Sequence, residues 1–265
     1  MSVLANGLHV RGHNIIMVTD YSRDNEYPIS SEIERIVLDG PLGEISKKGQ
    51  KTRNISRIRQ LRRLCAKYHI DVMISFLPDN NFRAILATLF LPTRNLISVR
   101  NVPQREFRSK KYRLTARTLY RLTSGCVFQT TEVQSWFDKS IQRKSRIIFN
   151  PISDVFFRID SAAGKRCDIQ AVGRLTKQKN FGLLIRVFAA IAQEYPDKTL
   201  TIYGEGPLRN ELETLISDLK LEHRICLPGS VSDIAEKEKE ALAFVLSSDY
   251  EGMPNALMEA MALGL

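Results

Sequence analysis

Strand-like and helix-like segments alternate at short spacing along this 265-residue chain, and that alternation most constrains its fold. In the first half, HNIIMVTD (13–20), DVMISFL (71–77) and GCVFQT (125–130) have the composition of buried strands. Amphipathic segments lie between them, among them the basic SRIRQLRRLCAKYHI (56–70). Strands that alternate with helices in this way predict a parallel, doubly wound α/β sheet.

The same rhythm restarts after a stretch without clear periodicity. We assign residues 151–166 to a linker, because no strand or helix period runs through them. After it, CDIQAVGRL (167–175), KTLTIYG (198–204) and AFVLSS (243–248) are predicted strands separated by helices. We therefore predict two Rossmann-like α/β lobes facing a cleft, an N-terminal lobe over 1–150 and a C-terminal lobe over 167–265.

Charge is unevenly distributed between the two predicted lobes. Residues 1–150 carry 26 Lys and Arg against 12 Asp and Glu, whereas residues 151–265 carry 13 against 17. Two basic clusters, 51–63 and 100–121, supply much of the excess. Such asymmetry indicates either solvated helix faces or a polyanionic partner, which is an anionic membrane surface or nucleic acid. No aromatic-studded basic strand or known module supports nucleic acid, so we expect none as a partner.

Composition excludes several other classes of protein. The longest apolar runs, 84–91 and 183–192, are far shorter than the ~20 residues of a membrane span. No secretory leader opens the sequence, so we expect a cytoplasmic protein. The cysteines lack the spacing of a metal site or disulfide framework and are predicted to be buried free thiols: Cys65, Cys126, Cys167 and Cys226.

Ligands of open α/β sheets bind where strands end and helices begin, and three such junctions in the second half carry unusual residues. In VGRLTKQKN (172–180), Gly173 and Arg174 leave a strand and Lys179 stands at the entrance of the next helix. Two cations beside a helix start favour an anion, although an exposed basic loop is the alternative. In YGEGPLRNE (203–211) two glycines allow close backbone approach to a ligand, or simply make a turn.

The third junction is DYEGMPNALMEAMALGL (249–265). Pro254 suits the first helical position, so the amides from Met253 to Ala256 would be free to bind an anion. Glu251 precedes the helix, and Glu259 interrupts its apolar face, where a carboxylate needs either a ligand hydroxyl or a salt bridge. The three junctions together describe a pocket for a diphosphate and a sugar.

No Asp-x-Asp motif occurs in the chain, so we expect diphosphate binding without a metal ion and no cofactor. Arg174, Lys179 and the helix start would offset the phosphate charge instead.

The segments VGRLTKQKN, YGEGPLRNELE and EGMPNALMEAMALG resemble the family-four retaining glycosyltransferases of the GT-B fold. The Glu-x7-Glu spacing of Glu251 and Glu259 carries most of the resemblance. More loosely, ISFLP (74–78), SVRNVP (98–103) and NPI (150–152) resemble the acceptor lobe and hinge of that family.

The resemblance implies a role for each matching residue. Arg174 and Lys179 would hold the pyrophosphate of a UDP- or GDP-sugar, Glu259 the ribose, and Glu251 would act at the donor sugar. Backbone near Gly229 and Val231 would contact the base. The remaining donor-side positions are Gly173, Gly252, Met253, Pro254 and Asn255.

The chain also departs from the family pattern. Members open with a strand and a Gly-rich loop and continue past the segment that ends here, so we expect a fragment truncated at both ends, both lobes incomplete. No histidine stands where relatives place an acceptor-side catalytic residue. Asp79, Arg100 and Asn101 are the acceptor-side candidates.

The resulting hypothesis is a transferase that moves a sugar from a nucleoside-diphosphate sugar to a lipid-linked or saccharide acceptor with retention, in surface polysaccharide or glycolipid synthesis. Peripheral contact with an anionic membrane at its inner face would suit the basic lobe. The alternative is a nucleotide-sugar-binding fragment without turnover.

Overall fold

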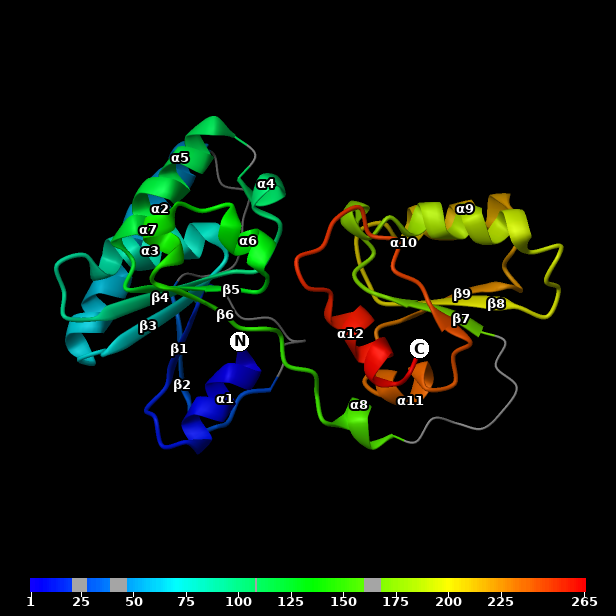
Figure 1. Ribbon diagram of the computed structural model, residues 1–265, viewed down its shortest axis with the longest axis horizontal. Coiled ribbons are helices and arrows are strands. Elements are labelled where there is room, and N and C mark those ends of the chain that lie inside the picture. The colour runs from blue at the N-terminus through cyan, green and yellow to red at the C-terminus, as the bar shows by residue number, and fades with distance from the viewer. Residues whose placement is uncertain (21–27, 39–46, 108, 160–167) are drawn as a thin grey trace. The chain divides into compact units, whose positions relative to one another are not determined.

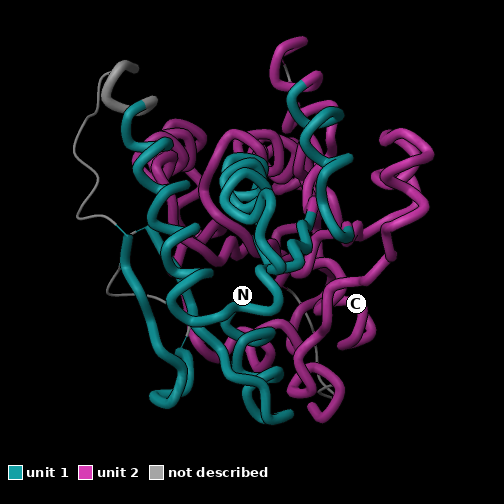
Figure 2. Tube along the Cα trace, turned by 90° about the vertical axis from the view of Figure 1, so that its left-hand side faces the viewer, with its two compact units in different colours: residues 1–98, 115–125 teal, residues 99–114, 126–265 magenta. Residues whose placement is uncertain are grey.

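A computed structural model describes residues 1–20, 28–38, 47–107, 109–159 and 168–265. The described chain divides into two compact units, residues 1–98 with 115–125 and residues 99–114 with 126–265 (Figure 2). The lobe and linker boundaries predicted at residues 150 and 166 stay predictions. None of the helices in these ranges has an apolar stretch long enough to span a bilayer.

The first unit is built from alternating helices and parallel strand pairs (Figure 1). Its elements are α1 (Ser2–Val10), β1 (Ile16–Thr19), β2 (Glu34–Val37), α2 (Lys47–Lys67), β3 (Val72–Phe76), α3 (Pro78–Thr88), most of β4 (Arg94–Val99), part of α5 (Lys110–Leu119) and the 3-10 turn η1 (Tyr120–Leu122). Strand β1 pairs in parallel with β2, and β3 pairs in parallel with β4. Strands β1 and β3 fall within the predicted strands 13–20 and 71–77.

A buried polar network fixes α3 against the strands of the first unit. The fully buried Asn81 accepts a hydrogen bond from Ser75 Oγ at 2.8 Å. Its amide nitrogen donates to the carbonyl oxygen of Ser98 at 3.1 Å and to the Tyr120 hydroxyl at 3.2 Å. Because buried polar groups need partners, this network specifies one packing of the helix.

Part of the basic cluster at 51–63 serves the interior of the first unit. Arg57 is 5% exposed, and its Nη1 lies 2.9 Å from the Asp20 carboxylate. Arg62 donates to the carbonyl oxygens of Ala87 and Leu89 at the end of α3, at 3.2 and 2.7 Å. These two arginines therefore bond within the unit, which neither alternative for the cluster, a solvated helix face or a polyanionic partner, takes into account.

The second unit contains the remaining elements. They are α4 (Pro103–Glu106), β5 (Gly125–Phe128), α6 (Thr131–Ser135), α7 (Lys139–Gln142), β6 (Ser145–Ile147), α8 (Val155–Arg158), β7 (Asp168–Val172), the 3-10 turn η2 (Lys177–Lys179), α9 (Phe181–Ile191), β8 (Thr199–Tyr203), α10 (Arg209–Asp218), β9 (Ile225–Gly229), α11 (Ile234–Glu238), β10 (Ala243–Phe244) and α12 (Asn255–Ala262). Strands β5 and β6 pair in parallel, and the sheet that follows residue 167 has the order β10-β7-β8-β9.

Helices cover both faces of the β10-β7-β8-β9 sheet (Figure 1). Helices α9 and α10 lie over one face, where the spacing of apolar residues in α9 buries Phe181, Ile185 and Phe188 against β7 and β8. Helices α11 and α12 lie over the other face, with a smaller cluster that contains Ala235 and Leu263. This is the doubly wound arrangement that the alternation of elements predicts.

Several local predictions were wrong. The predicted strand 243–248 is paired over Ala243–Phe244. Beyond this pair, Ser247 Oγ bonds to the carbonyl oxygen of Lys179 at 2.7 Å, which draws the chain toward a loop. Pro207 is typical of a first helical position, but helix α10 begins two residues later, at Arg209.

The cysteines follow their prediction in part. Cys65 and Cys126 are buried free thiols, and burial raises the pKa of Cys126 to about 12. Cys226 is exposed, contrary to prediction, because its side chain alternates outward on the outer strand β9. Cys167 lies outside the described residues.

The loops that leave β7 and β8 are joined through their backbones. Gly173 N donates to the carbonyl oxygen of Tyr203, and Leu175 N to that of Glu205, both at 2.9 Å. Gly204 has φ +135°, and a Cβ there would overlap the carbonyl oxygen of Gly173. Gly204 thus allows its loop to approach the loop at Gly173, and this contact is within the protein rather than with a ligand.

A buried carboxylate lies at the end of α11. Glu238 is 0% exposed, and neither of its carboxylate oxygens has a hydrogen-bond partner in the described part of the chain. Burial, and then the nearby charge of Glu259, raise the pKa of Glu238 to about 8. Glu238 thus binds a proton in the folded state at neutral pH and loses it in the unfolded state.

We expect Glu238→Gln to remove a pH dependence of stability. The folded pKa lies above the ordinary value of 4.5, so the folded state loses stability as pH rises from about 4.5 to about 8. Between pH 6 and pH 8.5 the wild type should lose about 2 kcal/mol relative to Glu238→Gln, measured by urea unfolding. The exposed Glu240→Gln is the control, and parallel pH curves for wild type and Glu238→Gln would refute the assignment.

Gly204→Ala should destabilise the second unit by about 3 kcal/mol, because the added Cβ combines a positive φ with backbone overlap. Gly7→Ala is the control and should raise stability, because Gly7 lies within helix α1 and a Cβ there would meet no other atom. Thermal unfolding of both variants compares them. An unchanged midpoint in Gly204→Ala would mean that the two loops are not held together as described.

Candidate donor-binding site

The predicted donor-side residues of the second unit gather at the carboxyl ends of β7, β8 and β10. Parallel strands place all their carboxyl ends at one edge of the sheet. Gly173 follows β7 directly, and Gly229, the last residue of β9, accepts from Gly204 N at 2.8 Å. Glu251 follows the short β10 after a loop of six residues.

Lys179 and Glu251 form an ion pair at this edge. The distance between Lys179 Nζ and Glu251 Oε1 is 2.8 Å, and the two side chains are 17% and 18% exposed. The Lys179 side chain runs across Gly173, where a Cβ would lie 2.9 Å from its Cε. The structure thus brings together the predicted phosphate-binding cation and the predicted sugar-binding carboxylate.

Further bonds hold the two loops that carry this ion pair. Asp249 N donates to the carbonyl oxygen of Gln178 at 2.9 Å, and Gln178 Nε2 donates to that of Tyr250 at 3.0 Å. Asn180 precedes α9 but does not cap it, because its amide donates to Asp249 Oδ1 at 2.8 Å. The 177–180 turn and the 247–251 loop are therefore fixed to each other.

Helix α12 begins next to this ion pair in sequence. The helix starts at Asn255. Pro254 is therefore its N-cap and not, as predicted, its first helical residue. The amides of Asn255, Ala256 and Leu257 have no intrahelical acceptor at such a start. They can bind an anion, and the dipole of the helix favours one there.

Glu259 is a half-buried carboxyl on α12. Burial raises the pKa of Glu259, and no salt bridge or hydrogen bond to its carboxylate occurs within the described ranges. The internal salt bridge that the sequence left open as an alternative is thus not observed in this part of the chain. A half-buried carboxyl without a protein partner can accept hydrogen bonds from ligand hydroxyls.

The side chain of Arg174 does not contact the Lys179–Glu251 ion pair. Its side chain is exposed, and in the described ranges its guanidinium makes no hydrogen bond or ion pair. The structure does not bring it into contact with Lys179, although both flank the loop after β7.

The predicted base-contacting residues lie beside a charged pair. A Cβ on the buried Gly229 would lie 2.8 Å from Glu205 Oε1, and Arg209 Nη2 holds that oxygen at 2.6 Å. Val231 is half-buried in the loop that follows. Glu205 and Arg209 were not predicted as site residues, although the YGEGPLRNE segment contains both.

The acceptor-side candidates belong to different units. Asp79 lies in the first turn of α3 in the first unit. In the second unit Asn101 Nδ2 donates to Glu106 Oε1 at 3.2 Å, and burial raises the pKa of Glu106. Burial also lowers the pKa of Arg100, whose guanidinium donates to Asn150 Oδ1.

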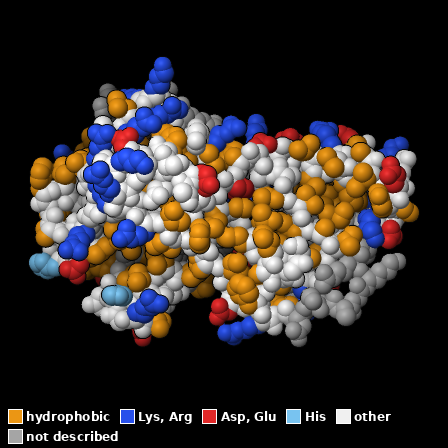
Figure 3. Space-filling view, in the orientation of Figure 1, with side chains coloured by type: hydrophobic (Ala, Val, Ile, Leu, Met, Phe, Trp, Pro, Cys, Tyr) orange, Lys and Arg blue, Asp and Glu red, His pale blue; other side chains and the backbone are white. Residues whose placement is uncertain are grey.

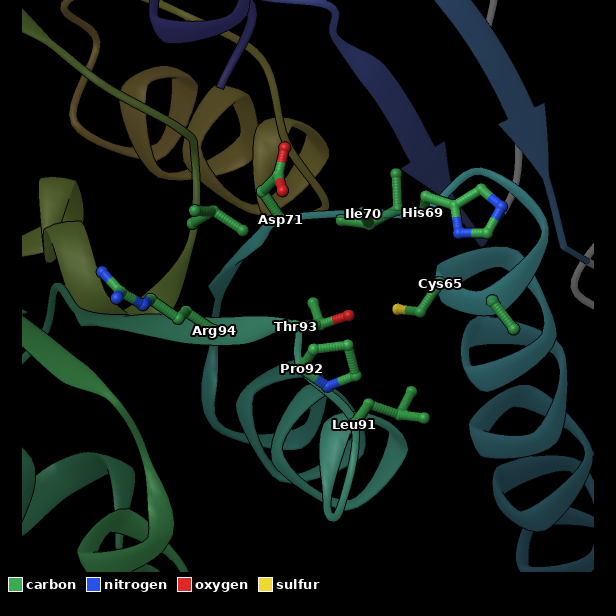
Figure 4. Close-up of a pocket in the computed structure, with 10 residues that line it drawn as sticks. Cys65, His69, Ile70, Asp71, Leu91, Pro92, Thr93 and Arg94 are labelled. Atoms are coloured by element: carbon green, nitrogen blue, oxygen red, sulfur yellow. The ribbon is translucent and has the colours of Figure 1, made fainter.

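A separate cavity of about 640 Å³ lies in the first unit (Figure 4). It is lined by Cys65, His69, Asp71, Thr93 and Arg94, among others. Burial raises the pKa of the Cys65 thiol, which disfavours the reactive thiolate. The cavity lies at the amino ends of β3 and β4, opposite to the edge at which α/β sheets bind ligands.

The chain is similar to known proteins in both sequence and structure. The model of the family "Glycosyl transferases group 1" matches residues 154–265. A relative from Campylobacter jejuni, N-acetylgalactosamine-N,N'-diacetylbacillosaminyl-diphospho-undecaprenol 4-alpha-N-acetylgalactosaminyltransferase, is 29% identical over 214 residues, covering 76% of this chain and 58% of its own. The chain spans about half the length of the curated relatives it matches.

Two solved structures show the same fold. Sucrose-phosphate synthase (tll1590) from Thermosynechococcus elongatus superposes with a TM-score of 0.78 at 17% identity, over 99% of this chain and 72% of its own. Anabaena Alr3699/HepE, solved in complex with UDP and glucose, gives 0.69 at 16% identity over 88% and 66%.

These likenesses confirm the α/β fold of GT-B type that the sequence predicts. Residues 154–265 are similar to the glycosyl transferases group 1 family, whose model they match.

Proposed function

We propose that the protein to which this chain belongs transfers a sugar from a nucleoside-diphosphate sugar to an acceptor, with retention of anomeric configuration. The observation that carries the proposal is the Lys179–Glu251 pair, which places a cation and a carboxylate together at the ligand-binding edge of the sheet. The family whose model matches residues 154–265 supports transfer chemistry. The Anabaena neighbour solved with UDP and glucose supports a nucleoside-diphosphate donor.

The diphosphate of the donor would bind without a metal ion. Lys179 supplies one positive charge, and the free amides of Asn255 and Ala256 supply hydrogen-bond donors at the positive end of the α12 dipole. The exposed Arg174 is free to turn toward the phosphates from the neighbouring loop.

The two carboxylates would bind the two sugars of the donor. Glu259 accepts hydrogen bonds from the ribose hydroxyls, which compensates its partial burial. Glu251 exchanges its bond with Lys179 for the hydroxyls of the transferred sugar as the ammonium moves to the diphosphate.

In the transfer step, the bond between the anomeric carbon and the phosphate oxygen breaks while the acceptor oxygen bonds to that carbon. The leaving phosphate takes the electron pair and accepts the proton of the acceptor hydroxyl. The amides and cations around the diphosphate stabilise the charge that develops on it. This chemistry requires no acceptor-side histidine.

The acceptor would be lipid-linked or a saccharide, in surface polysaccharide or glycolipid synthesis. The Campylobacter relative is named for a diphospho-undecaprenol acceptor. Helix α5 carries the basic residues Lys110, Lys111, Arg113 and Arg117, and its Leu114 is 64% exposed. Lys and Arg side chains are frequent on the surface at the upper left of the view (Figure 3). A basic helix with an exposed apolar residue suits peripheral contact with an anionic membrane.

Calorimetric titration with UDP and GDP tests the donor site. Arg174→Ala and Glu259→Ala should each weaken binding of the preferred nucleotide about tenfold, because each removes one contact to phosphate or ribose. Glu251→Ala should bind the nucleotide and lose turnover. Matched controls are Arg186→Ala on α9 and Glu194→Gln, both exposed residues distant in sequence from the site loops.

The proposal fails if the wild type binds neither nucleotide, or if all three variants bind as the controls do. Nucleotide binding without any transfer would favour the alternative, a nucleotide-sugar-binding fragment without turnover.

Vesicle co-sedimentation tests the membrane contact. The chain should bind vesicles with anionic lipid more strongly than neutral ones, and Lys110→Glu with Lys111→Glu should reduce that binding several-fold. Lys220→Glu with Lys237→Glu, two exposed residues outside α5, changes the net charge equally and is the control. Equal binding to anionic and neutral vesicles would exclude electrostatic attachment through α5.

A further inference from the structure

Asn150 lies three residues after β6 and contacts the loop that leads into α12. Its amide nitrogen donates to the carbonyl oxygen of Met253 at 3.2 Å and to Asn255 Oδ1 at 2.6 Å. Its backbone N donates to Met253 Sδ at 3.3 Å. One side chain thus bridges both sides of Pro254, the N-cap of α12.

The orientation of the Asn150 amide is set from its other side. Its Oδ1 accepts from the Arg100 guanidinium. A guanidinium carries donors only, so it must face the oxygen of the amide. The nitrogen of Asn150 therefore faces the loop. The amide of Gln129, which is 2% exposed, lies beside this contact: its nitrogen donates to the carbonyl oxygen of Arg100 at 2.8 Å, and its oxygen accepts from Asn150 Nδ2 at 2.8 Å.

The same loop is also held at Gly252. A Cβ at this position would overlap the carbonyl oxygen of Arg100, so only glycine allows this approach of the two backbones. Arg105 adds a contact nearby, with its guanidinium carbon 5.3 Å from the centre of the Tyr250 ring. The loop from Tyr250 to Asn255 is thus fixed by the 100–105 segment and by Asn150.

We propose that Asn150 is a positioning residue for the donor diphosphate. It touches no phosphate itself. By holding Met253 and Asn255, Asn150 fixes the direction of the backbone amides that begin α12. Arg100 in turn keeps the side-chain amide of Asn150 oriented toward the loop. This inference rests on the proposed function, because it assumes that those amides bind the diphosphate.

The test compares UDP with UMP in wild type and Asn150→Leu. Leucine has the shape of asparagine without its donors and adds no charge, so the amides lose their restraint without electrostatic repulsion. We expect UDP affinity to fall about tenfold and UMP affinity to change less than threefold, because the distal phosphate depends most on the loop. Asn210→Leu, on the exposed surface of α10, is the control.

Hydrogen exchange of the peptide that covers residues 250–258 gives a second readout without nucleotide. In Asn150→Leu it should exchange at least several-fold faster, with the fluorescence of the single Trp136 unchanged. If Asn150→Leu does not fold, Asn150→Asp, which keeps the acceptor for Arg100 and removes both donors, is measured by exchange alone.

Equal exchange in wild type and variant, or a parallel loss of UDP and UMP affinity, would overturn the positioning role. Absence of UDP binding in the wild type would instead refute the proposed function, while faster exchange would still support the restraint by Asn150.

Discussion

The carboxyl edge of the β10-β7-β8-β9 sheet determines where the chemistry of the second unit can occur. Parallel strands end at one edge, and the backbone bonds between the loops after β7 and β8 hold Lys179 in reach of Glu251. Without ligand, these two side chains neutralise each other. A diphosphate can replace the carboxylate at the ammonium, which would release Glu251 for the sugar that the diphosphate carries.

Among the buried and half-buried acidic side chains described in the second unit, Glu238 and Glu259 have no protein partner for their carboxylates, and they differ in how far they are enclosed. Glu238 is fully enclosed and carries a proton near neutral pH, whereas Glu259 is only half-buried. A ligand could satisfy Glu259, but not Glu238. Under the proposed function, burial of the Glu259 carboxyl would lower the stability of the free protein and be compensated when the ribose binds.

Periodicity was sufficient to predict the parallel α/β fold and most of its strands, because buried parallel strands are continuous apolar runs. It failed where tertiary contacts decide. The strand at 243–248 shortened because Ser247 bonds to a neighbouring loop, and the arginines at 57 and 62 turned inward. Spacing placed Lys179 and Glu251 in one site but gave no sign of their ion pair. Nothing in the sequence indicated that Asn150 contacts Met253, since only the folded chain brings the two residues together.

The central claim is that Lys179 and the start of α12 share one diphosphate while Glu259 binds the ribose. A crystal structure of the protein with UDP tests this most directly. The account predicts the diphosphate within hydrogen-bond distance of Lys179 Nζ and of the Asn255 and Ala256 amides, with both ribose hydroxyls on Glu259. A diphosphate bound away from Lys179, or a Glu259 carboxylate that faces away from the nucleotide, would contradict it.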